Sequence, residues 1–183
     1  MNPRYPQDDK VPERRPVLWF ASPGDPATLT GGYIYNARVI DGLTSQGWDV
    51  RRIRLPDAYP FPTASDQASA KNLLFEVGEA DVLVIDGLAL GAFSPDVLGN
   101  LRGKLVALVH HPLADESGLD ETQVAELTVS EILALRYAKG VIRDGPSPSS
   151  GAFPRHRRLA HVVSSVLSAP VSPVCWCGRA GVV

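Results

Sequence analysis

Two glycines, one aspartate and two histidines are the residues of this chain whose types and positions could support chemistry. Gly31 and Gly32 open a segment of helical periodicity, whereas Asp86 and the pair His110-His111 each follow an apolar run directly. Because glycine lacks a Cβ atom, the backbone there can approach a phosphate or a sugar closely. An imidazole can donate a hydrogen bond to a sugar hydroxyl or to a phosphate oxygen. The pattern therefore predicts a ligand site that these residues share.

The segments around these residues predict an α/β fold with a Rossmann-like parallel sheet flanked by helices. Apolar runs typical of buried parallel strands alternate with segments of helical period. Strands are expected over residues 17–21, 48–55, 81–87, 104–112 and 139–142, and helices over residues 30–46, 66–77, 94–101 and 121–137. In such sheets ligands bind beyond the carboxyl ends of the strands, which is where Asp86 and the histidines are expected.

The first and last helices have recognisable ends and apolar faces. Thr30 is the expected N-cap of the first helix, and Gly47 is its expected C′ residue. The apolar face of that helix is predicted from its spacing to hold Ile34, Ala37, Val39, Ile40 and Leu43. The last helix is expected to follow a cap at Asp120 and to bury Val124, Leu127, Ile132 and Leu135.

Each candidate residue also has a structural interpretation, and these alternatives stay open. Gly31 and Gly32 could form only a tight turn, and Asp86 could cap the next helix or turn. A single histidine is usually structural, although two at the end of a core strand are harder to explain by packing. The proline-rich loop at residues 56–62 could direct its two aromatic side chains toward a substrate or into the core.

Composition excludes several classes of function. The chain of 183 residues has a net charge of −2, which gives no basic field for nucleic acid. No apolar run approaches the roughly 18 residues that a membrane span needs, and residues 1–15 resemble a disordered lead-in rather than a secretory signal. The two cysteines, Cys175 and Cys177, have no nearby further ligands for a metal. A cytoplasmic protein without a metal or a cofactor is expected.

Several short motifs together resemble the N-terminal half of family 4 glycosyltransferases of the GT-B fold. The first motif is Thr-Gly-Gly-Tyr-Ile-Tyr-Asn at residues 30–36, and it is followed by Gly-Trp-Asp-Val at residues 47–50. The others are Asp-Gly-Leu-Ala at residues 86–89 and Leu-Val-His-His-Pro-Leu at residues 108–113, before an acidic segment. The resemblance covers about residues 16–142, so this range is expected to be one Rossmann-like domain.

This resemblance implies a retaining transferase that moves a sugar from a nucleotide-sugar to an acceptor, without a metal. The glycine turn would approach the donor diphosphate, and a histidine would contact the donor sugar. His111 is the better match to the family's histidine, with His110 beside it as the second catalytic candidate. Tyr35, Asn36 and Asp86 would join the glycines in binding donor or acceptor. The implied acceptor is a small molecule, a lipid or a glycan.

The chain departs from the family pattern after residue 142. Residues 143–183 have no sustained helical or strand period, where the family continues into a second, nucleotide-gripping domain. One hypothesis is that this irregular tail comes from a shifted reading frame on a truncated gene. The chain alone would then be inactive, and a complementing C-terminal domain would have to come from another chain.

Two other classes of protein remain as alternatives. A non-catalytic domain that binds a ligand or an acceptor would use the same residues without turnover. A dinucleotide-dependent oxidoreductase is less favoured, because no Gly-x-Gly-x-x-Gly motif stands before the first helix. A serine hydrolase is unsupported, since the sequence has no Gly-x-Ser-x-Gly motif.

Overall fold

A computed structural model describes residues 16–24 and 31–143 of the chain. The expected lead-in over residues 1–15, the N-cap at Thr30 and the two cysteines lie outside the described residues. Residues 144–183 of the expected tail also lie outside them, whereas Arg143 belongs to the last strand. None of the described helices has the length and the apolar character needed to cross a bilayer.

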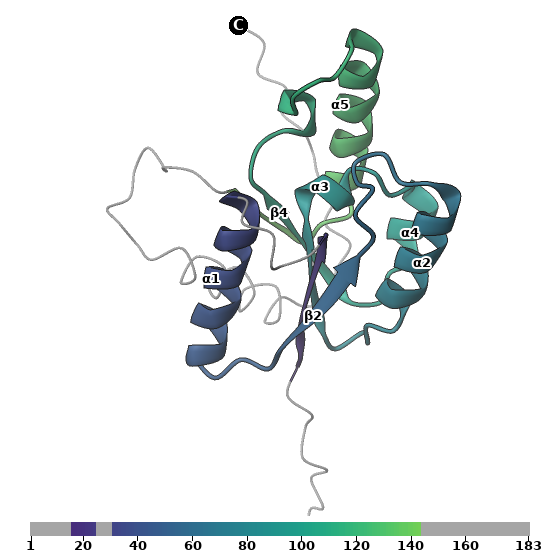
Figure 1. Ribbon diagram of the computed structural model, residues 1–183. Coiled ribbons are helices and arrows are strands. Elements are labelled where there is room, and N and C mark those ends of the chain that lie inside the picture. Colours follow the sequence, from purple (N-terminus) through teal and green to yellow (C-terminus); the bar gives the residue numbers. More distant parts are fainter. Residues whose placement is uncertain (1–15, 25–30, 144–183) are drawn as a thin grey trace, which may run out of the picture.

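The described residues form a Rossmann-like sheet of five parallel strands with helices around it, as predicted (Figure 1). The strands are β1 (Leu18–Pro23), β2 (Val50–Leu55), β3 (Val82–Asp86), β4 (Lys104–Val109) and β5 (Gly140–Arg143). The helices are α1 (Gly31–Ser45), α2 (Ala64–Phe75), α3 (Gly87–Leu90), α4 (Pro95–Gly99) and α5 (Glu121–Leu135), with a 3-10 turn η1 (Leu113–Asp115). The strand order is β2-β1-β3-β4-β5, so β1, β3 and β4 lie inside the sheet.

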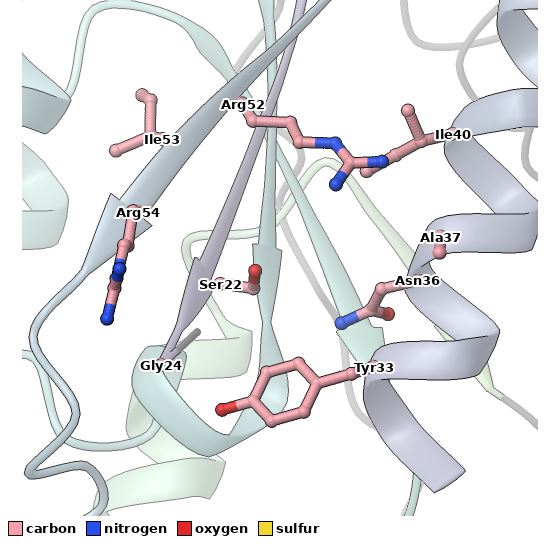
Figure 2. A pocket seen from close by; sticks show the side chains of 9 residues that line it. All are labelled: Ser22, Gly24, Tyr33, Asn36, Ala37, Ile40, Arg52, Ile53 and Arg54. Atoms are coloured by element: carbon pink, nitrogen blue, oxygen red, sulfur yellow. The ribbon is translucent and has the colours of Figure 1, made fainter. Parts of the chain in front are cut away.

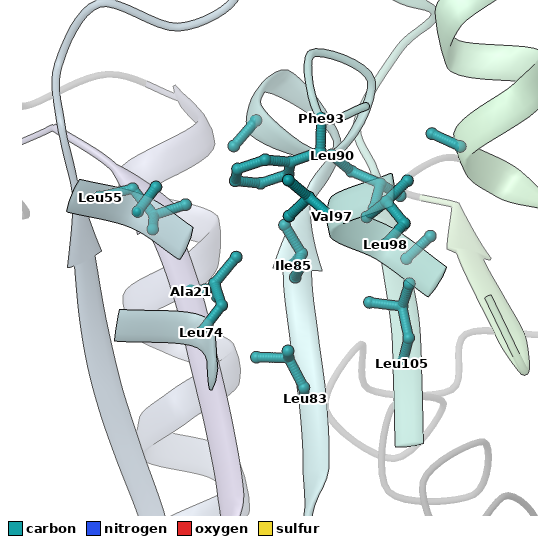
Figure 3. Close-up of a cluster of buried hydrophobic side chains, with 14 of the residues drawn as sticks. Ala21, Leu55, Leu74, Leu83, Ile85, Leu90, Phe93, Val97, Leu98 and Leu105 are labelled. Atoms are coloured by element: carbon teal, nitrogen blue, oxygen red, sulfur yellow. The ribbon is translucent and has the colours of Figure 1, made fainter. Parts of the chain in front are cut away.

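Successive side chains of each strand point to opposite faces of the sheet, and each face is covered by an apolar layer. On one face, Val82 and Val84 of β3 pack with Tyr35, Val39 and Leu43 of α1. On the other face, side chains of β3 meet those of the remaining helices (Figure 3). That layer includes Leu83, Ile85, Leu74, Leu90, Phe93, Val97 and Leu98. The sheet is therefore covered on both faces, which accounts for the unbroken apolar runs in its central strands.

Two apolar residues assigned to buried helix faces from the sequence are exposed instead. Ile34 is 41% exposed, because the buried stripe of α1 follows Tyr35, Val39 and Leu43 at a spacing of four residues. Ile132 of α5 is 53% exposed, because Leu127 and Ala134 face the core from that helix. The periodicity identified both helices correctly but misjudged the rotation of each about its axis.

The ends of the helices follow local capping chemistry. Gly47 has a φ of +87°, as expected of a C′ residue, which explains why glycine stands there. The α2 helix begins two residues earlier than expected, because Thr63 and Asp66 form a capping box. The Thr63 hydrogen bonds hold the pKa of the Asp66 carboxyl below its usual value. Asp120 caps α5 in the same way with Gln123.

The proline-rich loop before α2 divides its two aromatic side chains between core and solvent. Tyr59 is buried against Phe93, with 5.5 Å between the ring centroids, whereas Phe61 is 49% exposed. The inward interpretation therefore holds for Tyr59 only. Burial, and to a smaller extent the charge of Asp66, raises the pKa of the Tyr59 hydroxyl to about 12.

Replacing Tyr59 with phenylalanine is expected to raise the free energy of unfolding by up to about 1 kcal/mol at pH 7. Within the described part of the chain, no group hydrogen-bonds to the buried hydroxyl of Tyr59, so its removal relieves desolvation without breaking a bond. Above pH 10 the wild type is expected to lose further stability relative to the variant, since its unfolded chain ionises before the folded one. Urea unfolding measures both effects, and Tyr137→Phe, at a partly exposed tyrosine, is the matched control. A loss of more than about 1 kcal/mol in Tyr59→Phe would reveal a hydrogen bond to this hydroxyl.

Candidate functional site

Asp86 lies at the carboxyl end of β3 and connects three elements. Its Oδ1 accepts a hydrogen bond of 3.0 Å from the backbone N–H of Leu88 and so caps α3. Its Oδ2 accepts a bond of 2.8 Å from Nδ2 of Asn36 on α1. Both side chains are buried, so this bond joins α1 to the end of the central strand. The capping interpretation of Asp86 is thus confirmed, and its second oxygen faces α1.

His110 follows the next strand, β4, and stands beside Asp86. Its Nε2 lies 3.4 Å from Asp86 Oδ2, and its ring meets the Tyr35 ring edge-on with 5.0 Å between the centroids. The His110 side chain is 16% exposed, so one part of it remains accessible. Register explains the encounter, because β3 and β4 are adjacent parallel strands whose carboxyl ends lie side by side. This contact places an imidazole, which can donate or accept a proton, beside a buried carboxylate.

The two glycines belong to the first turn of α1 and do not form a separate tight turn. Among the described residues, a Cβ atom added to Gly32 would come within 4 Å of the His110 ring alone, at 3.9 Å, which is ordinary contact. Packing therefore does not require glycine at this position, and glycine is a poor helix former. Gly32 thus lies beside the His110 ring, next to the N–H groups that begin the helix.

His111 points away from this group. Its Nε2 lies 2.7 Å from Glu116 Oε1, and its side chain is 50% exposed. The following turn η1 is held by Glu131, whose Oε2 accepts a bond of 3.2 Å from the Leu113 N–H. Burial raises the pKa of the Glu131 carboxyl, and the Leu113 N–H opposes that rise. The structure thus brings His110, and not His111, together with Gly32, Tyr35, Asn36 and Asp86.

A hollow lies on the opposite flank of α1, between this helix and strands β1 and β2 (Figure 2). Its unfilled space is about 360 Å³, part of which is open to solvent. Asn36, which binds Asp86, also lines the hollow. Ser22, Arg52 and Arg54 also line it, and the sequence analysis did not single these out. The sequence did indicate that the two arginines lie on one face of a strand, because they are two residues apart.

Comparison with known proteins does not add a family, and metal ligands do not gather in the described residues. No protein-family model matches the chain, and no curated protein is significantly similar to it in sequence. In residues 16–24 and 31–143, no three His, Asp, Glu or Cys side chains approach one another as a metal site requires.

Proposed function

We propose that residues 16–143 form a glycosyltransferase-type domain, serving retaining transfer of a sugar from a nucleotide-sugar to an acceptor. The observation that carries this proposal is the meeting of Gly32, Tyr35, Asp86 and His110 from three separate elements. It agrees with the resemblance of the glycine and histidine motifs to family 4 glycosyltransferases. In this proposal the exposed part of the His110 ring donates to a sugar hydroxyl.

The first turn of α1 would bind the diphosphate group of the same nucleotide-sugar. Unpaired N–H groups and the positive end of the helix dipole favour an anion there, and Gly31 and Gly32 put no side chain in its path. Asp86 would orient the imidazole and would not itself contact the sugar, because it is buried and already accepts the Asn36 and Leu88 bonds. His111 stays a second candidate from the resemblance, on the exposed side of the segment after β4.

The sharpest test of the site compares the two neighbouring histidines. Calorimetry or NMR titration of the chain with sugars, nucleoside diphosphates and NAD first identifies which class binds. His110→Ala is expected to weaken binding of a sugar-containing ligand by about tenfold, since one hydrogen bond is worth roughly 1.4 kcal/mol in such a site. His111→Ala is expected to change it by less than about twofold. Equal effects of the two variants, or binding of NAD alone, would contradict the proposal.

A non-catalytic ligand-binding domain remains the main alternative. The exposed part of His110 and the backbone at Gly32 would serve a bound ligand equally well without turnover. An assay of sugar transfer from a panel of nucleotide-sugars to sugar or lipid acceptors discriminates the two. Transfer that depends on His110 favours the transferase, and unchanged binding without transfer favours the alternative.

A further inference from the structure

Helix α5 carries an apolar stripe on the side that points away from the core. Three large apolar side chains are exposed there, Val129 by 58%, Ile132 by 53% and Leu133 by 38%. Ile132 and Leu133 follow Val129 by three and four residues, so the three lie together on the helix surface. The core contacts of α5 come from its other side, through Leu127 and Ala134. Figure 1 shows α5 at the margin of the molecule, where this stripe is open to a partner.

Away from α5, the exposed large apolar side chains of the described residues stand singly. Ile34 lies on α1, Phe61 in the proline-rich loop and Leu73 on α2. Single exposed apolar residues are ordinary in proteins, whereas apolar side chains that gather in one patch are typical of an interaction surface. The stripe on α5 is therefore the part of the described surface that most needs an explanation.

The charged residues at the two ends of the stripe have no ion-pair partner on their own helix. Glu126 precedes Val129 by three residues, and Arg136 follows Leu133 by three. Ion pairs along a helix need a spacing of three or four residues, but Glu126 and Arg136 are separated by about 15 Å along the axis. The positions three and four residues before Arg136 hold Leu133 and Ile132. Among the described residues, neither charged side chain forms an ion pair.

A second, antiparallel copy of α5 would match both the apolar and the charged residues. If a two-fold axis passes beside position 131, Glu126 faces the partner's Arg136, and Val129 faces the partner's Leu133. The symmetry then repeats each contact in the opposite sense. Both pairs have their midpoint at the same position of the sequence, so a single axis serves the apolar contact and the ion pairs together. The charge pattern thus indicates which kind of partner fits the stripe.

We propose that α5 is the surface through which two copies of this chain associate, as an antiparallel pair of helices. One helix pair is small for a protein interface, so the association is reversible and depends on concentration. An anionic membrane surface fits this face less well, because it would favour Lys and Arg around the stripe, where Glu121 and Glu126 stand at one end. Glu131 lies on the opposite side of α5, so its bond to η1 is compatible with the pairing.

Sedimentation equilibrium of the full chain, over about a hundredfold range of concentration, tests this proposal. The expected result is an equilibrium between monomer and dimer. Ile132→Glu is expected to weaken the dimer by about a hundredfold, because it brings two carboxylates into an apolar contact beside the axis. The matched control is Leu73→Glu, which makes the same change at a position of α2 that is 43% exposed. It is expected to alter the association by less than about twofold.

Charge reversal tests the antiparallel arrangement. Arg136→Glu places two carboxylates against each other at both ends of the pair, so it is expected to weaken the dimer by about tenfold. Glu126→Arg is expected to have the same effect. A mixture of these two variants is expected to regain about the wild-type affinity, because each mixed pair restores two contacts between opposite charges. Parallel helices would instead place Arg136 beside the partner's Arg136, and neither variant would then weaken the dimer.

Three results would overturn the proposal. They are a chain that stays monomeric over the whole range, equal losses in Ile132→Glu and Leu73→Glu, and a mixture that associates no better than either charge variant alone. The first result includes the case in which residues 144–183 of the same chain cover the stripe. Circular dichroism identifies any variant that has lost its fold, and the charge variants at exposed positions then supply the comparison. The proposal is independent of ligand binding through His110, so its failure would leave the proposed function standing.

Discussion

Replacing Asp86 with alanine is expected to lower the free energy of unfolding by about 3 kcal/mol. The Asp86 carboxylate accepts bonds from Asn36 Nδ2 at 2.8 Å and from the Leu88 N–H at 3.0 Å. Alanine removes both acceptors and leaves the buried Asn36 amide without its partner, so the full desolvation cost of that group appears. It also removes the cap of α3. Urea denaturation followed by circular dichroism measures the loss.

The isosteric variant Asp86→Asn separates stability from ligand binding. Its Oδ1 can still accept from the Leu88 N–H, so the expected loss is smaller, about 1–2 kcal/mol. The charge facing His110 is gone, however, so the imidazole loses the group that orients it. We therefore expect ligand binding through His110 to weaken in Asp86→Asn although the fold persists. A variant that binds as tightly as the wild type would limit Asp86 to a structural role.

The parallel sheet and the alternation of strands and helices along the chain were predictable, because each depends on a pattern that extends over several residues. Apolar runs such as Val82-Leu83-Val84-Ile85 need cover on both faces, and only a parallel sheet between helices supplies it. The rotation of each helix was less predictable, as Ile34 and Ile132 show. Their exposure depends on which neighbouring strands lie beneath the helix, and the sequence does not state strand order.

The candidate site was predictable in its location but not in its pairing. Asp86 and the two histidines were expected at the carboxyl ends of the strands, and His110 and Asp86 do meet there. Which of His110 and His111 faces Asp86 depends on the direction that the chain takes after β4. Two contacts accompany that direction, one between His111 and Glu116 and one between the Leu113 N–H and Glu131. Both involve residues beyond the strand, so the pattern of the strand itself does not predict them.

The hollow beside β2 was not predictable from the sequence, for a different reason. Arg52 and Arg54 alternate with Ile53 and Leu55, which is ordinary for an edge strand with one face toward solvent. Only the position of α1 beside that strand makes the arginine face one wall of a hollow. Side chains that are unremarkable in a pattern thus become candidates once the covering helix is known.

The second large effect is expected at Asp81, five residues before Asp86 on the same stretch of chain. Its Oδ1 accepts a bond of 3.0 Å from the Val17 N–H, and its Oδ2 accepts one of 3.1 Å from the Trp19 indole. Asp81 is only 1% exposed and fixes the start of β1 against the start of β3. Asp81→Ala is therefore expected to cost about 3 kcal/mol, because two donors lose a charged acceptor in a buried place.

Comparing Asp81→Ala with Asp86→Ala isolates the role of the candidate site. Both variants are expected to lose similar stability, but Asp81 lies at the amino end of β3, away from Gly32, Asn36 and His110. At a temperature where both remain folded, Asp81→Ala is expected to bind the sugar-containing ligand within about twofold of the wild type, since no binding group is disturbed. Asp86→Ala is expected to bind at least about tenfold more weakly. If the two variants lost affinity in proportion to their stability alone, the carboxyl ends of β3 and β4 would be a structural junction and not a binding site.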